Sequence, residues 1–517
     1  MQAARPVRHR AAPAWLVVAA AAFIVAPADA QQVRVTPTIG ARITWTDNYN
    51  LSPDSERESD FITTITPGLS VNYTGPRAFL RGYLRVPLII YAEHSNENRA
   101  RPSVALNGNV EVVPDFFFID AHAVVAQNYF SPFGTRSNDI EIVNQNSYTT
   151  QSYSVAPYIR GTIGSNTSYV VRDENLWTVN SNASGAARTS VRDSYINRLS
   201  GSIDRQPTPF GWGANFNRSE YWFSGERDNR LLQQVRVRGI WQGSPQLQLY
   251  VTGGYEQNKL ELSDISHSIY GGGVRWRPTS RTTLDASAEE RFFGTGYNVT
   301  FSHRTPRTVW RFYAARDITS YPELVAQLPA GLSVTGLLED LLVSRIPDAT
   351  ERAEFVAGFI ENRGLPPVLG EPIDVYDQEI VLRQSALASL GLLGTNNSVF
   401  FNVFSATTED VAVEGSLLPP ALGARTNNKQ TGASAVWSHQ LGPRMSMTLS
   451  TRYTRTESEP DSTLRANYRT VRFNITRTVS PKTTVFAGAR WQDRDSTAGG
   501  SDYSEAAIFA GFNHSFR

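Results

Sequence analysis

The chain has 517 residues, with 49 Lys and Arg against 48 Asp and Glu, and its formal net charge is +1. This balance disfavours a nucleic-acid partner, because proteins that bind nucleic acids concentrate positive charge. The chain contains no cysteine, which excludes disulfides and thiolate metal sites. Its length suits one large barrel or two or three soluble domains.

The first thirty residues have the pattern of a secretory signal peptide. Arg5, Arg8 and Arg10 precede an apolar stretch over residues 14–26, and Ala28-Asp29-Ala30 forms a small-x-small cleavage site. The apolar stretch is shorter than the ~20 residues that a membrane-spanning helix needs, and no later stretch approaches that length. We therefore predict a signal peptide over residues 1–30 and export of the rest of the chain.

From Val33 onward, apolar residues occupy every second position for about ten residues at a time. Between Val33 and Trp45 the odd positions are mostly apolar, whereas the even positions are Arg, Thr or Gly. Alternating segments of about this length behind a secretory signal are typical of a transmembrane β-barrel, with one face toward lipid and the other toward the lumen. The mean hydropathy of −0.32 agrees with this, because half of each strand faces water.

Turn residues divide the chain into segments joined alternately by short and long connections. The short turns are predicted at residues 75–76, 114–115, 164–166, 206–209, 243–245, 278–280, 305–306, 394–397, 442–443 and 480–481. The long connections are predicted at residues 50–60, 93–101, 131–147, 173–190, 224–229, 257–266, 294–296, 318–375, 409–428, 456–463 and 493–502. These connections join about 22 antiparallel strands, in a range of 20 to 24, over residues 31–517. Outer-membrane barrels place their short turns in the periplasm and their longer loops outside the cell.

The alternation also assigns faces. The lipid-facing positions are predicted to include Phe61, Ile65, Leu69, Val71, Tyr73, Leu80, Leu84, Val86, Leu88, Phe210, Trp212, Ala214, Phe216, Leu247, Leu249, Val251, Val485, Ala487, Ala489 and Trp491. The last segment runs from Ala506 to Phe516, and an aromatic residue near the C-terminus is common in proteins that the barrel assembly machinery recognises. We therefore expect two partners, outer-membrane lipid and that machinery, in a Gram-negative bacterium. A soluble β-sandwich is the alternative.

The opposite parity places many arginines toward the lumen. They are Arg81, Arg85, Arg236, Arg238, Arg275, Arg277, Arg291, Arg311, Arg452, Arg472 and Arg490. The carboxylates of the same parity are fewer, among them Glu111, Asp120, Asp285 and Glu289. Rings of basic residues favour anions in pores. The alternative is a ladder of ion pairs across strands, for which Glu289, Arg291 and Arg275 are natural partners.

One long connection has helical rather than alternating patterns. In residues 318–375, Thr335 is a plausible N-cap before a leucine-rich turn, and Asp348 with Glu351 predicts the start of a helix that ends at Gly364. We call this connection the helical insert. It leaves and re-enters the barrel on the outer side, where it is expected to fold over the mouth or into the lumen, or to remain a surface excursion.

Three stretches resemble a known family. Residues 289–303 (EERFFGTGYNVTFSH), 304–310 (RTPRTVW) and 376–390 (YDQEIVLRQSALASL) are similar to the PEP-CTERM system-associated outer-membrane proteins. These proteins are found beside exopolysaccharide and exosortase genes. The resemblance implies an outer-membrane barrel that takes part in the export of surface polysaccharide or sorted proteins, with such a polymer or export-complex proteins as partners. It transfers no functional residue.

Other functions have less support. His122 lies two residues from Asp120, but no serine in a nucleophile-elbow context accompanies them, and HExxH and Asp-rich calcium loops are absent. We therefore expect no enzyme and no cofactor or metal, and a lipid or peptide hydrolase is the weakest alternative. TonB-dependent receptors carry a plug before the first strand, whereas alternation here begins at Val33. The sequence favours an export conduit or a structural component of a secretion system, with an anion-preferring diffusion porin as the main alternative.

Overall fold

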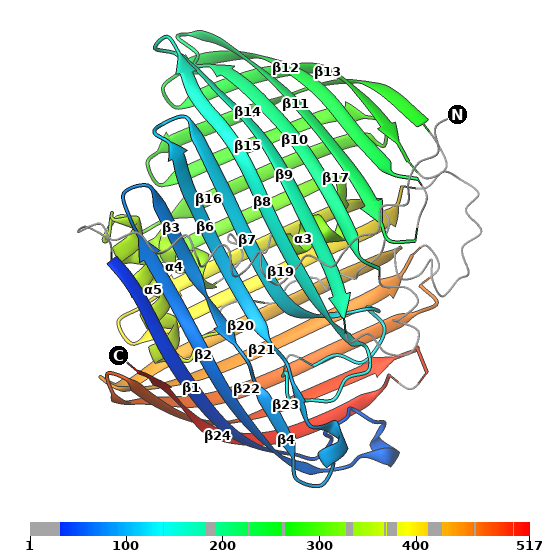
Figure 1. Cartoon of the computed structure of the whole chain (residues 1–517), viewed down its shortest axis with the longest axis vertical. Coiled ribbons are helices and arrows are strands. Elements are labelled where there is room, and N and C mark those ends of the chain that lie inside the picture. Colours follow the sequence, from blue (N-terminus) through cyan, green and yellow to red (C-terminus); the bar gives the residue numbers. More distant parts are fainter. Residues whose placement is uncertain are drawn as a thin grey trace.

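A computed structural model describes residues 32–137, 139–181, 192–225, 228–260, 264–326, 334–366, 369, 380–411, 427–459, 462–499 and 501–516. The predicted signal peptide over residues 1–30 lies outside the described residues. Within them, 24 strand segments form one antiparallel sheet that closes on itself (Figure 1). The segments are β1 (Gln32–Thr46), β2 (Asp60–Thr74), β3 (Ala78–Arg85), β4 (Leu88–Tyr91), β5 (Arg99–Ala100), β6 (Ser103–Val113), β7 (Phe117–Tyr129), β8 (Ser147–Ile163), β9 (Thr167–Ser181), β10 (Ser194–Arg205), β11 (Phe210–Phe223), β12 (Arg230–Ser244), β13 (Leu247–Lys259), β14 (Asp264–Thr279), β15 (Thr282–Arg291), β16 (Gly294–Arg304), β17 (Thr308–Ser320), β18 (Ile380–Leu393), β19 (Asn397–Asp410), β20 (Asn428–Gly442), β21 (Met445–Ser458), β22 (Arg465–Ser480), β23 (Thr483–Ser496) and β24 (Tyr503–Ser515). Short 3-10 turns, η1 (Asp54–Glu56) and η2 (Ser95–Glu97), lie in two of the long connections.

The barrel has 22 strands, because two of them are interrupted. β2 pairs with both β3 and β4, and the partners of these two are β6 and β5. Pro87 separates β3 from β4, and Pro102 separates β5 from β6. Proline has no backbone N–H to donate, so it breaks a strand at that point. β1 pairs with β24 from Thr38↔Ser515 to Thr46↔Ala507, which closes the barrel and confirms the predicted strand number.

The two faces of the wall differ as the alternation predicts. Outward positions carry exposed apolar side chains, with Phe210 71% exposed and Val251 69% exposed. Inward positions on the same wall are polar and covered, as Thr44 and Thr46 show in β1. Every backbone group within lipid must be paired inside the protein, and a closed sheet meets this requirement.

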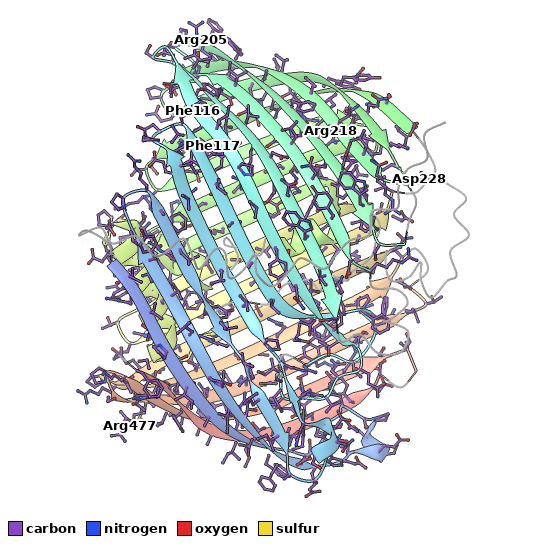
Figure 2. The ribbon with its side chains drawn as sticks, viewed as in Figure 1. Phe116, Phe117, Arg205, Arg218, Asp228 and Arg477 are labelled. Carbon is purple, nitrogen blue, oxygen red and sulfur yellow. The ribbon has the colours of Figure 1, made fainter. Side chains whose placement is uncertain are left out.

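All ten predicted short turns join consecutive strands at one rim, and the longer connections lie at the other. Figure 2 shows Arg205 and Arg477 at the short-turn rim and Asp228 at the long-loop rim. Two predicted connections are wrong. The predicted loop over residues 173–190 begins too early, because β9 continues to Ser181. The connection predicted at residues 294–296 is instead Phe292-Phe293, and Gly294 already belongs to β16.

The insert between β17 and β18 contains α3 (Tyr321–Ala326), α4 (Val334–Leu342) and α5 (Ala349–Arg363) among its described residues. Asp348 caps α5, since its carboxylate accepts a hydrogen bond from the Glu351 N–H at 2.7 Å. Gly364 ends α5 with a φ of 60°, a conformation that glycine adopts without a steric penalty. Both boundaries of this helix agree with the prediction. α4 begins at Val334, so Thr335 lies within the helix and does not cap it.

The helices of the insert lie inside the barrel. β17 ends at the long-loop rim, yet α4 and α5 lie beside the start of β1 at the short-turn rim (Figure 1). Arg345, just after α4, donates a hydrogen bond at 3.0 Å to the carbonyl oxygen of Pro306, a residue of the short turn before β17. Of the open alternatives for the insert, the structure shows burial in the lumen. No described helix is long and apolar enough to span a membrane.

The two rims make a testable prediction about topology. An epitope tag inserted between Ser462 and Thr463 extends a long connection, whereas one between Pro443 and Arg444 extends a short turn. We expect antibody to label the first tag on intact cells and the second only after permeabilisation. Labelling of the Pro443–Arg444 tag on intact cells would reverse the orientation.

Candidate functional site in the lumen

The eleven arginines predicted to line the lumen do not gather at one place, and Arg277 is exposed near the end of β14. Arg81 and Arg85 stack over the rings of Phe79 and Tyr83. The other eight divide among the wall, the helical insert and one loop. Arg236, Arg238, Arg275 and Arg291 contact carboxylates of the wall, Arg311 and Arg452 contact the insert, and Arg472 and Arg490 contact the connection between β7 and β8.

Ion pairs along the wall exist, but their partners differ from those expected. Glu289 of β15 pairs with Arg236 of β12 at 2.9 Å, across the two intervening strands, and not with Arg275 or Arg291. Gly254 is opposite Arg236, and Gly271 is opposite Glu289. Glycine at both positions leaves no side chain between the two partners. The alternation of polar and apolar residues does not predict such a pair, because it indicates only which side chains of a strand face the lumen.

The other predicted wall arginines pair either with the neighbouring strand or across one intervening strand. Arg275 pairs with Asp285 directly across the strand pair, at 2.8 Å. Arg238 reaches Asp204 at 2.9 Å. Arg291 is buried and bonds the fully buried Glu256 at 2.8 Å, with Asp317 at 3.0 Å on its other side.

The carboxylate of Asp120 is engaged by groups other than His122. Arg172 forms an ion pair with it, and the side-chain amide of Asn109 donates a hydrogen bond at 2.6 Å. Asp120 therefore does not orient His122 as a triad carboxylate would. Among the described residues, no group of three or more His, Asp or Glu side chains is placed to hold a metal ion.

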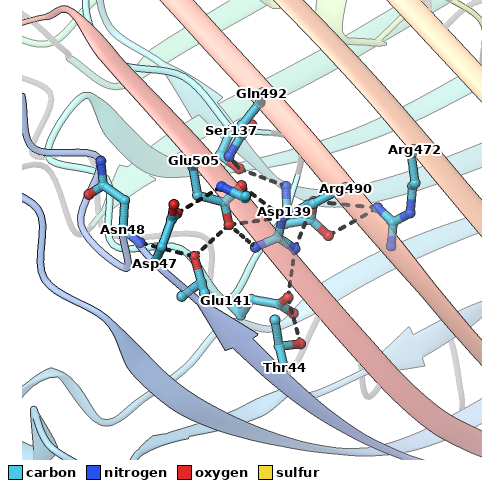
Figure 3. Close-up of polar contacts among 12 residues, drawn as sticks. Thr44, Asp47, Asn48, Ser137, Asp139, Glu141, Arg472, Arg490, Gln492 and Glu505 are labelled. Atoms are coloured by element: carbon cyan, nitrogen blue, oxygen red, sulfur yellow. Dashed lines mark hydrogen bonds and ion pairs between the residues drawn. The ribbon is translucent and has the colours of Figure 1, made fainter. Parts of the chain in front are cut away.

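The connection between β7 and β8 folds into the barrel, and we call residues 130–146 the inward loop. It carries Asp139 and Glu141 to the inner face of the seam where β1 meets β24 (Figure 3). Arg490 of β23 bonds Asp139 at 3.0 Å, Glu141 at 2.8 Å and Glu505 at 2.8 Å. The Arg490 side chain is only 2% exposed, so this cluster is shielded from water. The sequence indicated only a long connection at residues 131–147.

Threonines of β1 complete the cluster at the seam. The Thr44 hydroxyl donates to Glu141 at 3.0 Å, and the Thr46 hydroxyl donates to Glu505 at 2.6 Å. Burial raises the pKa of the Asp139 carboxyl, but the guanidinium groups of Arg472, Arg490 and Arg42 outweigh burial and hold that pKa below its ordinary value. The inward loop is therefore fixed by charged hydrogen bonds to the barrel wall.

The helical insert is fixed mainly by an apolar cluster. Leu337, Leu338, Leu341 and Leu342 of α4 are buried together with Val356 of α5. Inward-facing wall residues complete this cluster, and they are Val309, Phe400 and Val436. An apolar patch on the inner wall thus provides a docking site for α4.

Polar contacts surround this apolar cluster. Arg311 donates to Asp340 of α4 at 2.7 Å. At the end of α5, Arg363 donates to Ser398 at 3.0 Å and to Gln440 at 3.1 Å. Nearer the long-loop rim, Glu323 of α3 pairs with Arg198 and accepts a hydrogen bond from Tyr221 at 3.1 Å. The insert therefore contacts the wall both near the short-turn rim and near the long-loop rim.

A cavity of about 940 Å³ remains between the insert and the wall strands from β12 to β19. Leu324 of α3 and Asp340 of α4 line it on the insert side. On the wall side it includes Arg236, Glu289 and Arg291. The lumen is thus divided into a filled part and a basic cavity beside it.

Comparisons with known proteins concern the barrel. No family model matches the sequence, and no curated protein matches it. The siderophore receptor PirA from Acinetobacter baumannii aligns over 93% of this chain and 80% of its own, with a TM-score of 0.48 and 9% identity. The FrpB iron transporter from Neisseria meningitidis (F5-1 variant) aligns over 93% and 82%, with a TM-score of 0.48 and 8% identity. OmpTdeltaL8, a loop-deletion mutant of an outer membrane protein of Vibrio cholerae, aligns over 94% and 100%, with a TM-score of 0.31 and 9% identity.

The seam cluster predicts a large effect of a small substitution. Asp139→Asn should lower the free energy of unfolding by about 2–3 kcal/mol at neutral pH, because it removes charged hydrogen bonds to Arg472 and Arg490. Asp493→Asn is the matched control, since Asp493 pairs with Arg469 in a half-exposed position, and it should cost under about 1 kcal/mol. The stability of each variant is measured as the resistance of its folded gel mobility to heat and denaturant. Equal stability of the two would show that the cluster does not hold the barrel.

The depressed pKa of Asp139 sets the pH dependence of this effect. A carboxylate with a lowered folded-state pKa stabilises the protein above its unfolded value of about 3.9, and this stabilisation is lost as pH falls through the lower folded value. The stability difference between the native protein and Asp139→Asn should therefore stay constant from pH 8 to pH 5 and shrink only below about pH 4. A difference that already shrinks between pH 7 and pH 5 would contradict this assignment.

Proposed function

We propose that this protein is an outer-membrane conduit in the export of exopolysaccharide or secreted protein, and that the helical insert is its gate. The observation that supports the gate is the position of α4 and α5, which dock inside the barrel at the short-turn rim. In an outer-membrane barrel that rim faces the periplasm. The insert therefore lies where cargo for export would enter.

The direction of transport is supported by the sequence resemblance. Residues 289–310 and 376–390 resemble outer-membrane proteins found with exopolysaccharide and exosortase genes. Among the described residues, these stretches include the end of β15, all of β16, the start of β17 and most of β18, on either side of the insert. An anion-preferring diffusion porin is the second candidate, because a basic cavity passes beside the insert. Porins conduct small solutes without a partner, whereas a gated conduit stays closed until its insert moves.

Excision of the insert tests the gate. Replacing Pro329 to Pro366 with a short Gly/Ser bridge removes α4 and α5 and leaves the wall pairs between β17 and β18 in place. In planar bilayers we expect the native protein to be silent and the excised protein to conduct. Cells that carry the excised protein should also become sensitive to bulky antibiotics. Steady open channels of equal size from both proteins would favour the porin.

A single substitution makes the same test without removing chain. Leu338 is fully buried against the apolar wall patch, so Leu338→Asp should cost about 3–5 kcal/mol of docking free energy and open the channel. Ala357→Asp, on the exposed side of α5, is the control and should leave the channel closed. Heat-modifiable mobility would verify that both barrels still fold. A folded Leu338→Asp protein that remains silent would argue against a gate held by this contact.

A further inference from the structure

The cavity beside the insert extends through most of the membrane thickness. Along β16 its lining runs from Gly296 to Arg304, which at about 3.3 Å per residue is about 26 Å of strand. A strand tilted by about 40° rises about 20 Å over that length, close to the apolar band of about 25 Å. Arg281 lies at its short-turn end and Thr319 at its long-loop end. The cavity therefore reaches across most of the apolar band but does not cross all of it in the docked state.

The cavity is also narrow. A volume of about 940 Å³ over about 26 Å gives a mean cross-section of about 36 Å². An extended polypeptide in stacked sheets occupies roughly 4.8 Å by 10 Å, or about 48 Å². The two areas are similar, so the cavity has about the width of a single extended polymer chain and excludes a folded domain.

Its charge is positive. Of the described residues that line it, seven are Arg and three are carboxylates, Glu289, Asp317 and Asp340. Each carboxylate already pairs with an arginine, namely Arg236, Arg291 and Arg311 respectively. Arg281, Arg304 and Arg316 form no ion pair with a described carboxylate, so a positive excess remains in a cavity with low-dielectric walls, which strengthens its field.

The charge changes along the axis of the barrel. A second cavity of about 440 Å³ at the short-turn rim is lined by Arg205, Arg238 and Arg275 against Asp204. A third cavity, of about 240 Å³ near the long-loop rim, is balanced, with Arg198 and Arg291 against Asp317 and Glu323. Arg238 and Arg275 of the second cavity pair with Asp204 and Asp285, so the positive excess at the short-turn rim comes from Arg205, whereas the cavity near the long-loop rim is balanced. An anion is therefore attracted more at the entrance than near the exit. Favourable entry with weak final binding is what transport through a pore requires.

We propose that this cavity is the translocation path and that its ligand is a single extended polyanionic glycan whose sugars carry carboxylates. The proposal rests on the proposed conduit function and adds the substrate class. Arginines supply attraction for the carboxylates, and the hydroxyl and amide side chains between them, including Asn298, Thr300 and Ser302, supply hydrogen bonds for sugar hydroxyls. An acidic polypeptide would use the charges but leave these groups with fewer partners.

The test is a binding measurement on the intact, full-length protein in detergent. The probe is octagalacturonate with a fluorescent label at one end, followed by fluorescence polarisation. We expect binding that weakens with added salt, competition by unlabelled octagalacturonate, and no competition by uncharged malto-octaose. Equal competition by malto-octaose would overturn the role of charge.

Variants locate the site. Arg281→Gln combined with Arg304→Gln removes two charges at the short-turn end of the cavity and should weaken octagalacturonate binding about tenfold. Arg477→Gln is the matched control, because Arg477 lies at the same rim (Figure 2) and does not line the cavity. Heat-modifiable mobility would verify folding of each variant. Equal weakening by Arg477→Gln would show that the probe binds outside the cavity.

Two further probes define the ligand. If the galacturonate monomer binds as tightly as the octamer, the cavity is a site for small anions and not for a polymer. Oligoglutamate that binds as tightly as octagalacturonate would replace the glycan with an acidic polypeptide. The binding test is independent of the gate test, because it uses the closed protein. Binding as expected, together with unchanged conductance after excision of the insert, would leave the glycan site standing and reject the gated conduit.

Discussion

The width of a 22-stranded barrel governs the rest of this structure. Side chains from the wall fill the interior of an eight-stranded barrel, but they cannot meet across one of this size. The interior must therefore hold water or segments of the chain itself. Here the inward loop fills the sector at the seam of β1 and β24, and α4 and α5 fill the sector beside β17 to β22. The basic cavity lies between the insert and the wall, against β12 and β15 to β19.

The sequence predicted what depends on local pattern. Strand number, faces and short turns follow from a period of two and from turn residues, and the ends of α5 follow from Asp348 and Gly364. The end of β9 was missed because Asp173 and Asn175 place polar residues on the outward parity and so resemble a loop, although in the barrel Asp173 accepts a hydrogen bond from Asn197 at 2.7 Å. The docked inward loop was missed because Glu141 and Arg490 lie 349 positions apart. Alternation carries no information about which lumen-facing groups meet across the barrel.

The inward loop and the insert are held in different ways, which suits them to different roles. The described residues of the inward loop form no helix or strand, so the loop backbone depends on side chains for hydrogen bonds. Asn146 donates to the carbonyl oxygens of Ser131 and Thr135 at 2.8 and 2.9 Å, and Asn144 donates to that of Thr135 at 3.0 Å. Moving this loop would break charged and backbone hydrogen bonds together, at a high cost in free energy. The inward loop is therefore held in place against the wall.

The insert satisfies its own backbone, because a helix pairs its N–H and C=O groups internally. α4 and α5 also pack on each other, so a displaced pair keeps part of its apolar burial. Displacement mainly exposes the wall side chains of Val309, Phe400 and Val436, whose burial under α4 stabilises docking by about 2 kcal/mol each. A total near 6 kcal/mol corresponds to an undocked population of about one in twenty-five thousand. Thermal motion alone therefore leaves the insert docked, and a partner that binds the undocked helices more tightly by the same amount would open the path.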